Sequence, residues 1–380
     1  MARPSGLAEI DELPEPDRLE GFPPPRLTER LYGQDLAERG FLQAFQSARL
    51  HHAWILTGAP GIGKATLAYR IARFLLASES ERDMLGSSLE VAPETQASHL
   101  VAGLAHPELL VLRRPYDFKN KRLKTEITVD EVRRLKGFLG TSAGDGWRVV
   151  IVDPVDELNT NAANAVLKSL EEPPKRTVFL LISSAPERLL PTIRSRCRTL
   201  SCAPLSPEDL RRAVAQALNA AGDEVSGSLP AGEEWETLQR LAEGSVRRLL
   251  LLHTSKGLAL SRKINGFMES LPKPDWAAIH ALGDELGSAA AEARYELFFE
   301  LLLGHLAHII RAAATGETGT SEGRLADRLI TQDQLAAWAQ LWETLVADKA
   351  DADALNLDRK ALILLTFQRL VQASRGAAQA

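Results

Sequence analysis

Residues 54–72, WILTGAPGIGKATLAYRIA, constrain the fold most, because they join a short apolar run, a glycine-rich turn and a helical pattern. Glycines in such a turn let the backbone approach a polyphosphate without Cβ clashes, so that N–H groups can wrap it. The glycines here are Gly58, Gly61 and Gly63. Lys64 can reach the outer phosphates, and the helix that starts beside it points its positive end at the same place. The stretch predicts a phosphate-binding loop between a strand and a helix.

This loop departs from the usual pattern G-x-x-x-x-G-K-[ST] at its last position, which is Ala65. That position normally supplies the hydroxyl that holds Mg²⁺. Thr66 offers a hydroxyl one residue later, but one residue turns a helix by about 100° and directs it away from the phosphates. The loop is predicted to bind ATP or ADP at a degenerate site and to hydrolyse it poorly. The less favoured alternative is a tight strand-to-helix turn without a ligand.

Length and composition bound the class of protein. The 380 residues indicate two or three domains, and the net charge of −5 excludes a generally basic DNA-coating protein while allowing a local basic patch. Cys197 and Cys202 are too few for a disulfide framework or a cysteine metal cluster, which fits a reducing cytosol. We find neither an apolar signal core nor about 18 uninterrupted apolar residues, so a cytoplasmic protein without a membrane span is expected.

A second motif follows at residues 147–159, WRVVIVDPVDELN. An apolar run of this kind is typical of a central parallel strand that is buried on both faces. Asp153 stands at its C-terminal end, where ligands bind in open α/β sheets, and is placed as the second metal-site carboxylate of a P-loop NTPase. The next residue is Pro154, which cannot polarise a water molecule. This is a second defect in hydrolysis.

The pattern along the chain predicts four segments. Strand-like runs at 54–56, 109–112 and 177–182 join the run at 147–153, and the β-type runs stop near Pro204. The predicted segments are an extended proline-rich arm (1–28), a P-loop α/β domain with a parallel sheet (29–203), a helical lid (204–262) and an all-helical domain (270–380).

Several polar features have two readings. Residues 113–124 hold six basic residues and one acidic residue, and a solvated loop is favoured over a surface for nucleic-acid phosphate or an acidic partner. Ser183 and Ser184 could sense a γ-phosphate or could simply start a turn. Arg196 could reach outward or form a surface ion pair. Arg247 opposes the dipole at a predicted helix start, which suggests an anionic partner.

These motifs together resemble one family. In order, the chain carries GAPGIGKAT, VDEVRRL, RVVIVDPVDELN, NAANAVLKSLEEPP, TVFLLISSAPERLLPTIRSRC and GSVRRLL, as the clamp-loader subunits of bacterial DNA polymerase III do, within the AAA+ ATPases. The resemblance is strong over residues 30–255 and loose over the C-terminal helices. Because Ala65 and Pro154 depart from the hydrolysing pattern, the chain is similar to the delta-prime type and not to the motor type.

The resemblance implies a fold and a set of roles. An AAA+ nucleotide domain, a small helical lid and a helical collar would follow one another, with the collar holding a five-subunit ring together. Arg196 matches the arginine finger that reaches into a neighbouring subunit's ATP site. Arg247 falls at the second nucleotide-sensing arginine of the lid. Family members often carry a four-cysteine zinc module before the Asp153 strand, and zinc is not expected here because no cysteine lies in that region.

The expected function is that of a structural subunit in DNA replication without ATPase or polymerase activity of its own. It would close a heteropentamer with motor and delta subunits, donate Arg196, and help to place a sliding clamp on primed DNA. One alternative is an ATP-hydrolysing motor of the gamma/tau type, with Thr66 as the Mg²⁺ ligand. Another is a stand-alone homohexameric AAA+ remodeller, against which Pro154 counts.

Overall fold

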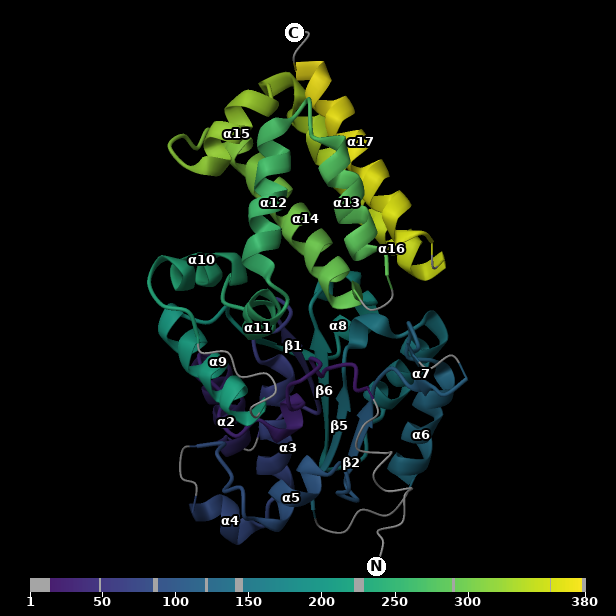
Figure 1. Ribbon diagram of the computed structural model, residues 1–380. Coiled ribbons are helices and arrows are strands. Elements are labelled where there is room, and N and C mark those ends of the chain that lie inside the picture. Colours follow the sequence, from purple (N-terminus) through teal and green to yellow (C-terminus); the bar gives the residue numbers. More distant parts are fainter. Residues whose placement is uncertain are drawn as a thin grey trace, which may run out of the picture. The chain divides into compact units, whose positions relative to one another are not determined.

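The structure, a computed structural model, describes residues 14–47, 49–84, 88–119, 122–140, 146–221, 229–288, 291–355 and 357–377. The chain divides into two compact units, Met1–Arg248 and Leu249–Ala380. Figure 1 shows that the first unit mixes strands and helices and that the second is helical. This division lies inside the segment 204–262 that the sequence predicts as a lid. The lid and collar boundaries at 203, 262 and 270 stay a prediction.

A five-stranded parallel sheet forms the centre of the first unit, with strand order β2-β5-β6-β1-β7. Its strands are β1 (Ala53–Thr57), β2 (Leu109–Leu112), β5 (Arg148–Val152), β6 (Thr177–Ser183) and β7 (Arg198–Ser201). Strand β6 separates β1, which leads into the phosphate loop, from β5, which ends before Asp153. Because parallel strands end at one edge, the loop and Asp153 share the carboxyl edge of the sheet.

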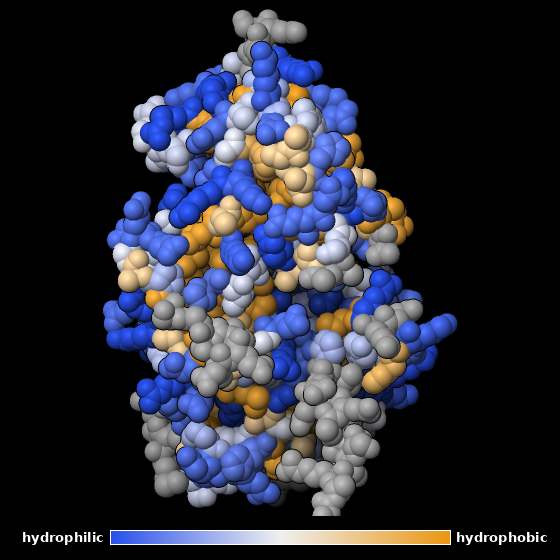
Figure 2. Space-filling model, in the orientation of Figure 1, coloured by the Kyte–Doolittle hydropathy of each residue, from blue (hydrophilic) through white to orange (hydrophobic). Residues whose placement is uncertain are grey.

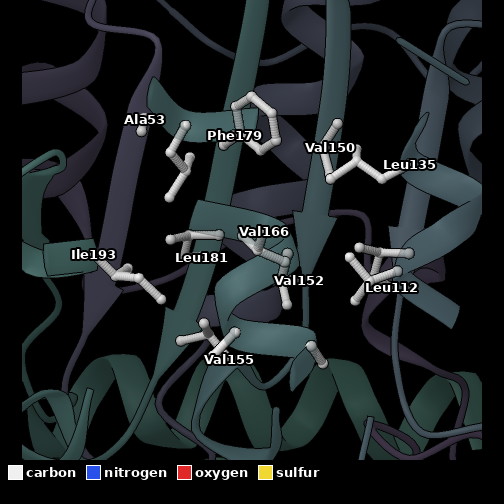
Figure 3. Close-up of a cluster of buried hydrophobic side chains, with 14 of the residues drawn as sticks. Ala53, Leu112, Leu135, Val150, Val152, Val155, Val166, Phe179, Leu181 and Ile193 are labelled. Atoms are coloured by element: carbon white, nitrogen blue, oxygen red, sulfur yellow. The ribbon is translucent and has the colours of Figure 1, made fainter. Parts of the chain in front are cut away.

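The apolar runs form strands that are buried on both faces, as predicted. Every residue of β5 and β6 is buried. One face packs against α6, α7 and α8, and Figure 3 shows side chains of this core, among them Val150, Phe179 and Val166. The other face is covered by α3, which contacts β1, β5 and β6. Helices on both faces explain why these strands read as continuous apolar runs.

The first unit also contains helices, which alternate with its strands along the chain. They are α2 (Asp35–Gln46), α3 (Lys64–Leu76), α4 (Glu79–Met84), α5 (Gln96–Ala102), α6 (Val129–Gly140), α7 (Thr160–Glu171), α8 (Pro191–Arg194), α9 (Pro207–Ala221), α10 (Glu233–Ala242) and the first residues of α11 (Val246–Thr254). Together with the sheet, they confirm the predicted α/β fold with a parallel sheet.

Sequence reasoning missed strand β7. Of its four residues, Leu200 is buried and the other three are exposed. The strand forms the end of the sheet beside β1, with Arg198 opposite Trp54. Because β7 is an edge strand that packs only Leu200 against the core, its sequence has no apolar run from which the strand could be predicted.

The predicted extended arm differs from the structure over residues 14–28, and its first 13 residues lie outside the described part. Phe22 is 3% exposed, and a 3₁₀ turn, η1, spans Pro25–Leu27. Glu15 forms ion pairs with Arg26 at 2.7 Å and with Arg113 at 2.5 Å. One aromatic residue and one carboxylate therefore hold a proline-rich segment against the first unit, which its composition did not predict.

The second unit is a bundle of helices after the end of α11, as the sequence predicts. Its helices are α12 (Gly257–Ser270), α13 (Trp276–Leu286), α14 (Glu292–Thr315), α15 (Ser321–Leu329), α16 (Leu335–Leu355) and α17 (Arg359–Ala377). The longest, α14, contacts α12, α13, α15 and α16. By length and composition α14 could cross a membrane, but buried core helices pass the same test, and Phe298, Leu302 and Leu306 of α14 are fully buried in this bundle.

Hydrophilic residues predominate on the face of the molecule in Figure 2, with apolar residues in narrow streaks. Some large apolar side chains are nevertheless exposed. Leu36 is 78% exposed on α2, Phe118 is 73% exposed after β2, and Leu355 is 69% exposed at the end of α16. Exposed apolar residues that stand alone are normal in soluble proteins. Such a residue therefore indicates a function only when neighbouring residues support it.

Candidate nucleotide site and arginine finger

The predicted phosphate loop has a left-handed backbone at its three glycines. The φ angles are +137° at Gly58, +74° at Gly61 and +101° at Gly63. Residues other than glycine rarely adopt such positive φ angles. The loop leaves β1, and α3 begins at Lys64. Sequence reasoning therefore placed the strand, the turn and the helix correctly.

Lys64 is bound by its own loop. Its Nζ donates hydrogen bonds to the carbonyl oxygens of Gly58 at 2.7 Å and Ala59 at 2.6 Å, and to Ser184 Oγ at 2.9 Å. Burial lowers the pKa of Lys64, whereas Cys202, Asp153 and Asp156 oppose that shift. The ammonium group stays compensated by oxygen atoms of the protein itself. A phosphate would have to compete with these three acceptors.

Asp153 lies at the same edge of the sheet, after β5. It is 8% exposed, and its Oδ2 has no hydrogen-bond partner among the described residues. Burial raises the pKa of Asp153 to about 7; Asp17 and Glu157 add to the shift, and Lys64 opposes it. Within the described ranges, no group of three or more His, Cys, Asp or Glu side chains could hold a metal ion.

Sequence reasoning missed Asp156, which organises the end of β6. Its Oδ1 accepts from Ser183 Oγ at 2.6 Å, and its Oδ2 accepts from the backbone N–H of Ser184 at 2.6 Å. A 3₁₀ turn over Val155–Glu157 carries Asp156 to this position. The signal in the sequence was an acidic residue three positions after Asp153. Both serines therefore have partners within the protein, Asp156 for Ser183 and Lys64 for Ser184 Oγ.

The side chains after Lys64 do not complete a Mg²⁺-nucleotide site. Ala65 occupies the second position of α3 and brings a methyl group where a hydroxyl is required. Thr66 is half-buried at the third position. The backbone of the loop thus fits a phosphate, while the donor set of its side chains does not fit a bound divalent metal.

The first turn of α11 closes over the loop at Gly61. The backbone N–H of Val246 donates to the Gly61 carbonyl oxygen at 3.0 Å, and Ser245 Oγ donates to the Pro60 carbonyl oxygen at 2.8 Å. Ser245 Oγ also accepts from the N–H of Arg248 at 3.2 Å, so Ser245 caps the start of α11. The structure brings Arg247 next to the loop, because a Cβ added at Gly61 would lie 2.5 Å from Arg247 Cβ.

Arg196 lies away from this site. It follows α8 and precedes β7, whose Arg198 pairs with Trp54 near the start of β1. Gly58 lies four residues further along β1, which corresponds to about 13 Å in the strand direction. Arg196 thus lies at the amino edge of the sheet and the phosphate loop at the carboxyl edge.

Glu171 holds the Arg196 side chain. Arg196 Nη2 lies 2.9 Å from Glu171 Oε1, and Nη1 donates to the Thr192 carbonyl oxygen at 3.0 Å. The Arg196 side chain is 38% exposed and that of Glu171 44%. Both readings of the sequence therefore have support, since the arginine forms a surface ion pair and can still be reached from outside.

Comparison with known proteins finds similar DNA polymerase III subunits. A family model described as "DNA polymerase III, delta subunit" matches residues 33–206. DNA polymerase III subunit delta' of Pseudomonas aeruginosa is 43% identical over 40% of this chain and 43% of that protein. The Escherichia coli subunit delta' is 29% identical over 69% of this chain and 72% of its own length. Residues 33–206 are thus similar to the delta-prime subunits of DNA polymerase III.

The residues that match the family model lie within the first unit. The phosphate loop, Asp153 and Arg196 lie inside the matched residues, and Arg247 lies beyond them. The chain matches less than half the length of the P. aeruginosa relative. The gamma subunit of Buchnera aphidicola also matches, at 28% identity over 60% of this chain and 58% of that protein, so motor subunits are relatives as well.

Proposed function

We propose that this chain is a structural subunit of a DNA polymerase III clamp loader in DNA replication. It would close a heteropentameric ring with motor and delta subunits in the cytoplasm and help to load a sliding clamp on primed DNA. In this role it donates Arg196 to the ATP site of the neighbouring motor. The names of the delta-prime relatives support the assignment.

One observation carries the proposal. Arg196 and the chain's own phosphate loop lie at opposite edges of the sheet, as the pairing of Arg198 with Trp54 requires. A half-exposed guanidinium group there can stabilise charge on a phosphoryl group that another chain binds, and a donated arginine of this kind accelerates transfer by about 10³ to 10⁵. Ala65 and Pro154, by contrast, leave the chain's own site without a metal-binding hydroxyl or a base.

The loop could still hold ATP or ADP without hydrolysing it. The backbone N–H groups after Gly58 and the start of α3 would contact phosphate, and Lys64 would have to leave its carbonyl acceptors. Asp153 and Arg247 would border the nucleotide. The bound phosphates would place negative charge where the phosphate loop contacts the first turn of α11.

A reconstitution experiment tests the proposal. The chain is mixed with motor and delta subunits, clamp and primed DNA, and ATP hydrolysis is measured. We expect Arg196→Ala to leave the complex intact by size exclusion while the completed ATP site slows by about 10³-fold or more. Arg194→Ala, at the last residue of α8, is the control and should change little. Unchanged hydrolysis with Arg196→Ala would remove the finger assignment.

The similarity to a gamma subunit supports one competing function. In this alternative the chain is an ATP-hydrolysing motor with Thr66 as the Mg²⁺ ligand. This reading predicts ATP turnover by the isolated chain and its loss in Lys64→Ala. Appreciable turnover of this kind would replace the structural assignment. A homohexamer of the pure chain on size exclusion would instead favour a stand-alone remodeller.

A further inference from the structure

The basic segment that follows β2 forms a small hairpin. Tyr116–Asp117 (β3) pairs antiparallel with Arg122–Leu123 (β4), with Tyr116 opposite Leu123. The N–H of Lys124 donates to the Pro115 carbonyl oxygen at 3.0 Å and closes the base of the hairpin. At its other end, Asp117 Oδ1 accepts from the N–H of Lys119 at 2.9 Å. The favoured prediction of a solvated loop is therefore incomplete, because residues 116–117 and 122–123 pair as two short strands.

The structure divides the positive charge of this segment into two parts. Arg113 pairs with Glu15 at 2.5 Å, and Arg114 pairs with Glu157 at 2.7 Å, so these two arginines serve the fold. The cations of the hairpin, Lys119, Arg122 and Lys124, are exposed. No carboxylate of the described residues forms an ion pair with any of these three. The three cations outnumber Asp117, the one carboxylate of the hairpin, which stands opposite Arg122, so the hairpin presents net positive charge on a chain whose net charge is −5.

An aromatic ring stands among these cations. Phe118 is 73% exposed, and its ring meets that of Tyr116 edge to face, with the centroids 5.2 Å apart. The contact with Tyr116 holds the ring and leaves much of its surface to solvent. Exposing a phenylalanine forgoes a burial free energy of about 1.5–3 kcal/mol.

This combination fits a single strand of nucleic acid better than a protein. A stable protein partner buries about 800 Å² on each side around an apolar centre with few charges. The hairpin offers one ring surrounded by cations. A single strand needs an aromatic face for a base and cations for the neighbouring phosphates, and duplex DNA would leave the ring without a partner because its bases are stacked.

We propose that residues 116–119 and 122–124 of the hairpin bind single-stranded DNA, with Phe118 stacked on a base and Lys119, Arg122 and Lys124 at phosphates. The hairpin follows β2 at the carboxyl edge of the sheet, whereas Arg196 lies at the amino edge. The proposal therefore goes beyond the arginine-finger role and does not depend on it.

Binding of the full chain to a labelled 20-residue oligothymidine, followed by fluorescence anisotropy at about 50 mM salt, tests the proposal. We expect Phe118→Ala to weaken binding about 10-fold, because one stacked base is lost, and Phe118→Trp to retain it. Leu36→Ala, which removes an equally exposed apolar side chain on α2, is the control and should have no effect.

The salt dependence tests the cations separately. Three phosphate contacts give a slope of log affinity against log salt of about −2 for a single strand. Replacing Lys119, Arg122 and Lys124 together by alanine should abolish most of that slope. The same change of charge at Lys136, Lys168 and Arg212, which are exposed on α6, α7 and α9, should leave most of it.

Each remaining outcome counts against the proposal. Absence of binding, or binding that is indifferent to Phe118→Ala, would overturn it. Equal binding of a duplex of the same length would show a charge effect without stacking and would overturn it as well. None of these results would bear on Arg196, which is tested by ATP hydrolysis.

Discussion

Single residues decide what the phosphate loop can do. Gly61 meets the first turn of α11 so closely that an added Cβ would lie 2.5 Å from both Arg247 Cβ and Ser245 Oγ. Its φ of +74° also strains any other residue. The contact between the loop and α11 therefore depends on a missing side chain at this position.

We expect Gly61→Ala to lower the free energy of unfolding by about 1–3 kcal/mol, since it adds backbone strain and a clash. Urea denaturation measures the effect. The control is Gly137→Ala on α6, where an added Cβ meets nothing within 4 Å. That control should raise stability by up to about 1 kcal/mol, because alanine is the better helix former. Similar effects at both positions would show that the junction is loose in solution.

Asp153 makes stability depend on pH. Its pKa is raised from 3.8 to about 7, so the folded chain holds a proton that the unfolded chain releases between these values. Stability from this group is fully present below about pH 4 and is lost as pH rises through 7, by up to about 4 kcal/mol. We expect Asp153→Asn, which cannot ionise, to gain stability relative to the wild type over this range. A difference that is constant from pH 4.5 to 8 in urea denaturation would contradict the assignment.

Glu171 competes with a nucleotide for Arg196 under the proposed function. An exposed ion pair contributes up to about 1 kcal/mol. Releasing the arginine should therefore change the apparent affinity of this chain for the motor's ATP site by no more than about fivefold. We expect Glu171→Gln to lower the concentration of this chain that half-saturates ATP hydrolysis by the motor. Glu172→Gln, at the next position, is the control. If Glu171→Gln acted equally in the Arg196→Ala background, its effect would not pass through the arginine.

At the scale of elements, what could be predicted depended on how each element is buried. Strands β1, β5 and β6 are buried on both faces and were read from their apolar runs. Strand β7 was not predicted because Leu200 is its only buried residue. The position of Arg196 on the opposite edge from its own loop follows from this strand, so that part of the argument required the structure.

The packing of the arm against the first unit was not predicted for a related reason. Its composition is that of a linker, but Phe22 and Glu15 attach it to the first unit. Contacts with distant residues such as Arg113 leave no local pattern in the sequence. Asp156 was missed in the same way, since its partners Ser183 and Ser184 lie 27 and 28 residues further along the chain.

We expect Phe22→Ala to release the arm, because it removes a buried aromatic side chain that contributes several kcal/mol in a packed site. Limited trypsin digestion, followed by mass spectrometry, should show faster cleavage after Arg18 and Arg26 than in the wild type. Leu27→Ala, which removes a side chain that is 45% exposed, is the matched control. Equal cleavage rates in all three proteins would mean that the ion pairs of Glu15 suffice to hold the arm.

At the scale of the whole molecule, the chain has two compact units, and each has its own fully buried side chains. We expect Leu302→Ala in α14 to cost about 2–5 kcal/mol. In hydrogen exchange, protection should fall in residues 249–377 and persist in the sheet of the first unit. Loss of protection in both units together would show that the chain unfolds as one cooperative body.

Lys64 gives the loop an internal ligand, with a consequence for affinity. The carbonyl oxygens of Gly58 and Ala59 already occupy the ammonium group, so an incoming phosphate faces an intramolecular competitor that is always present. The measured affinity is then the intrinsic affinity multiplied by the fraction of time that Lys64 is released, and each 1.4 kcal/mol in favour of the closed form weakens binding about tenfold. Under the proposed function, a nucleotide would therefore bind this loop more weakly than it would bind a loop whose lysine is free.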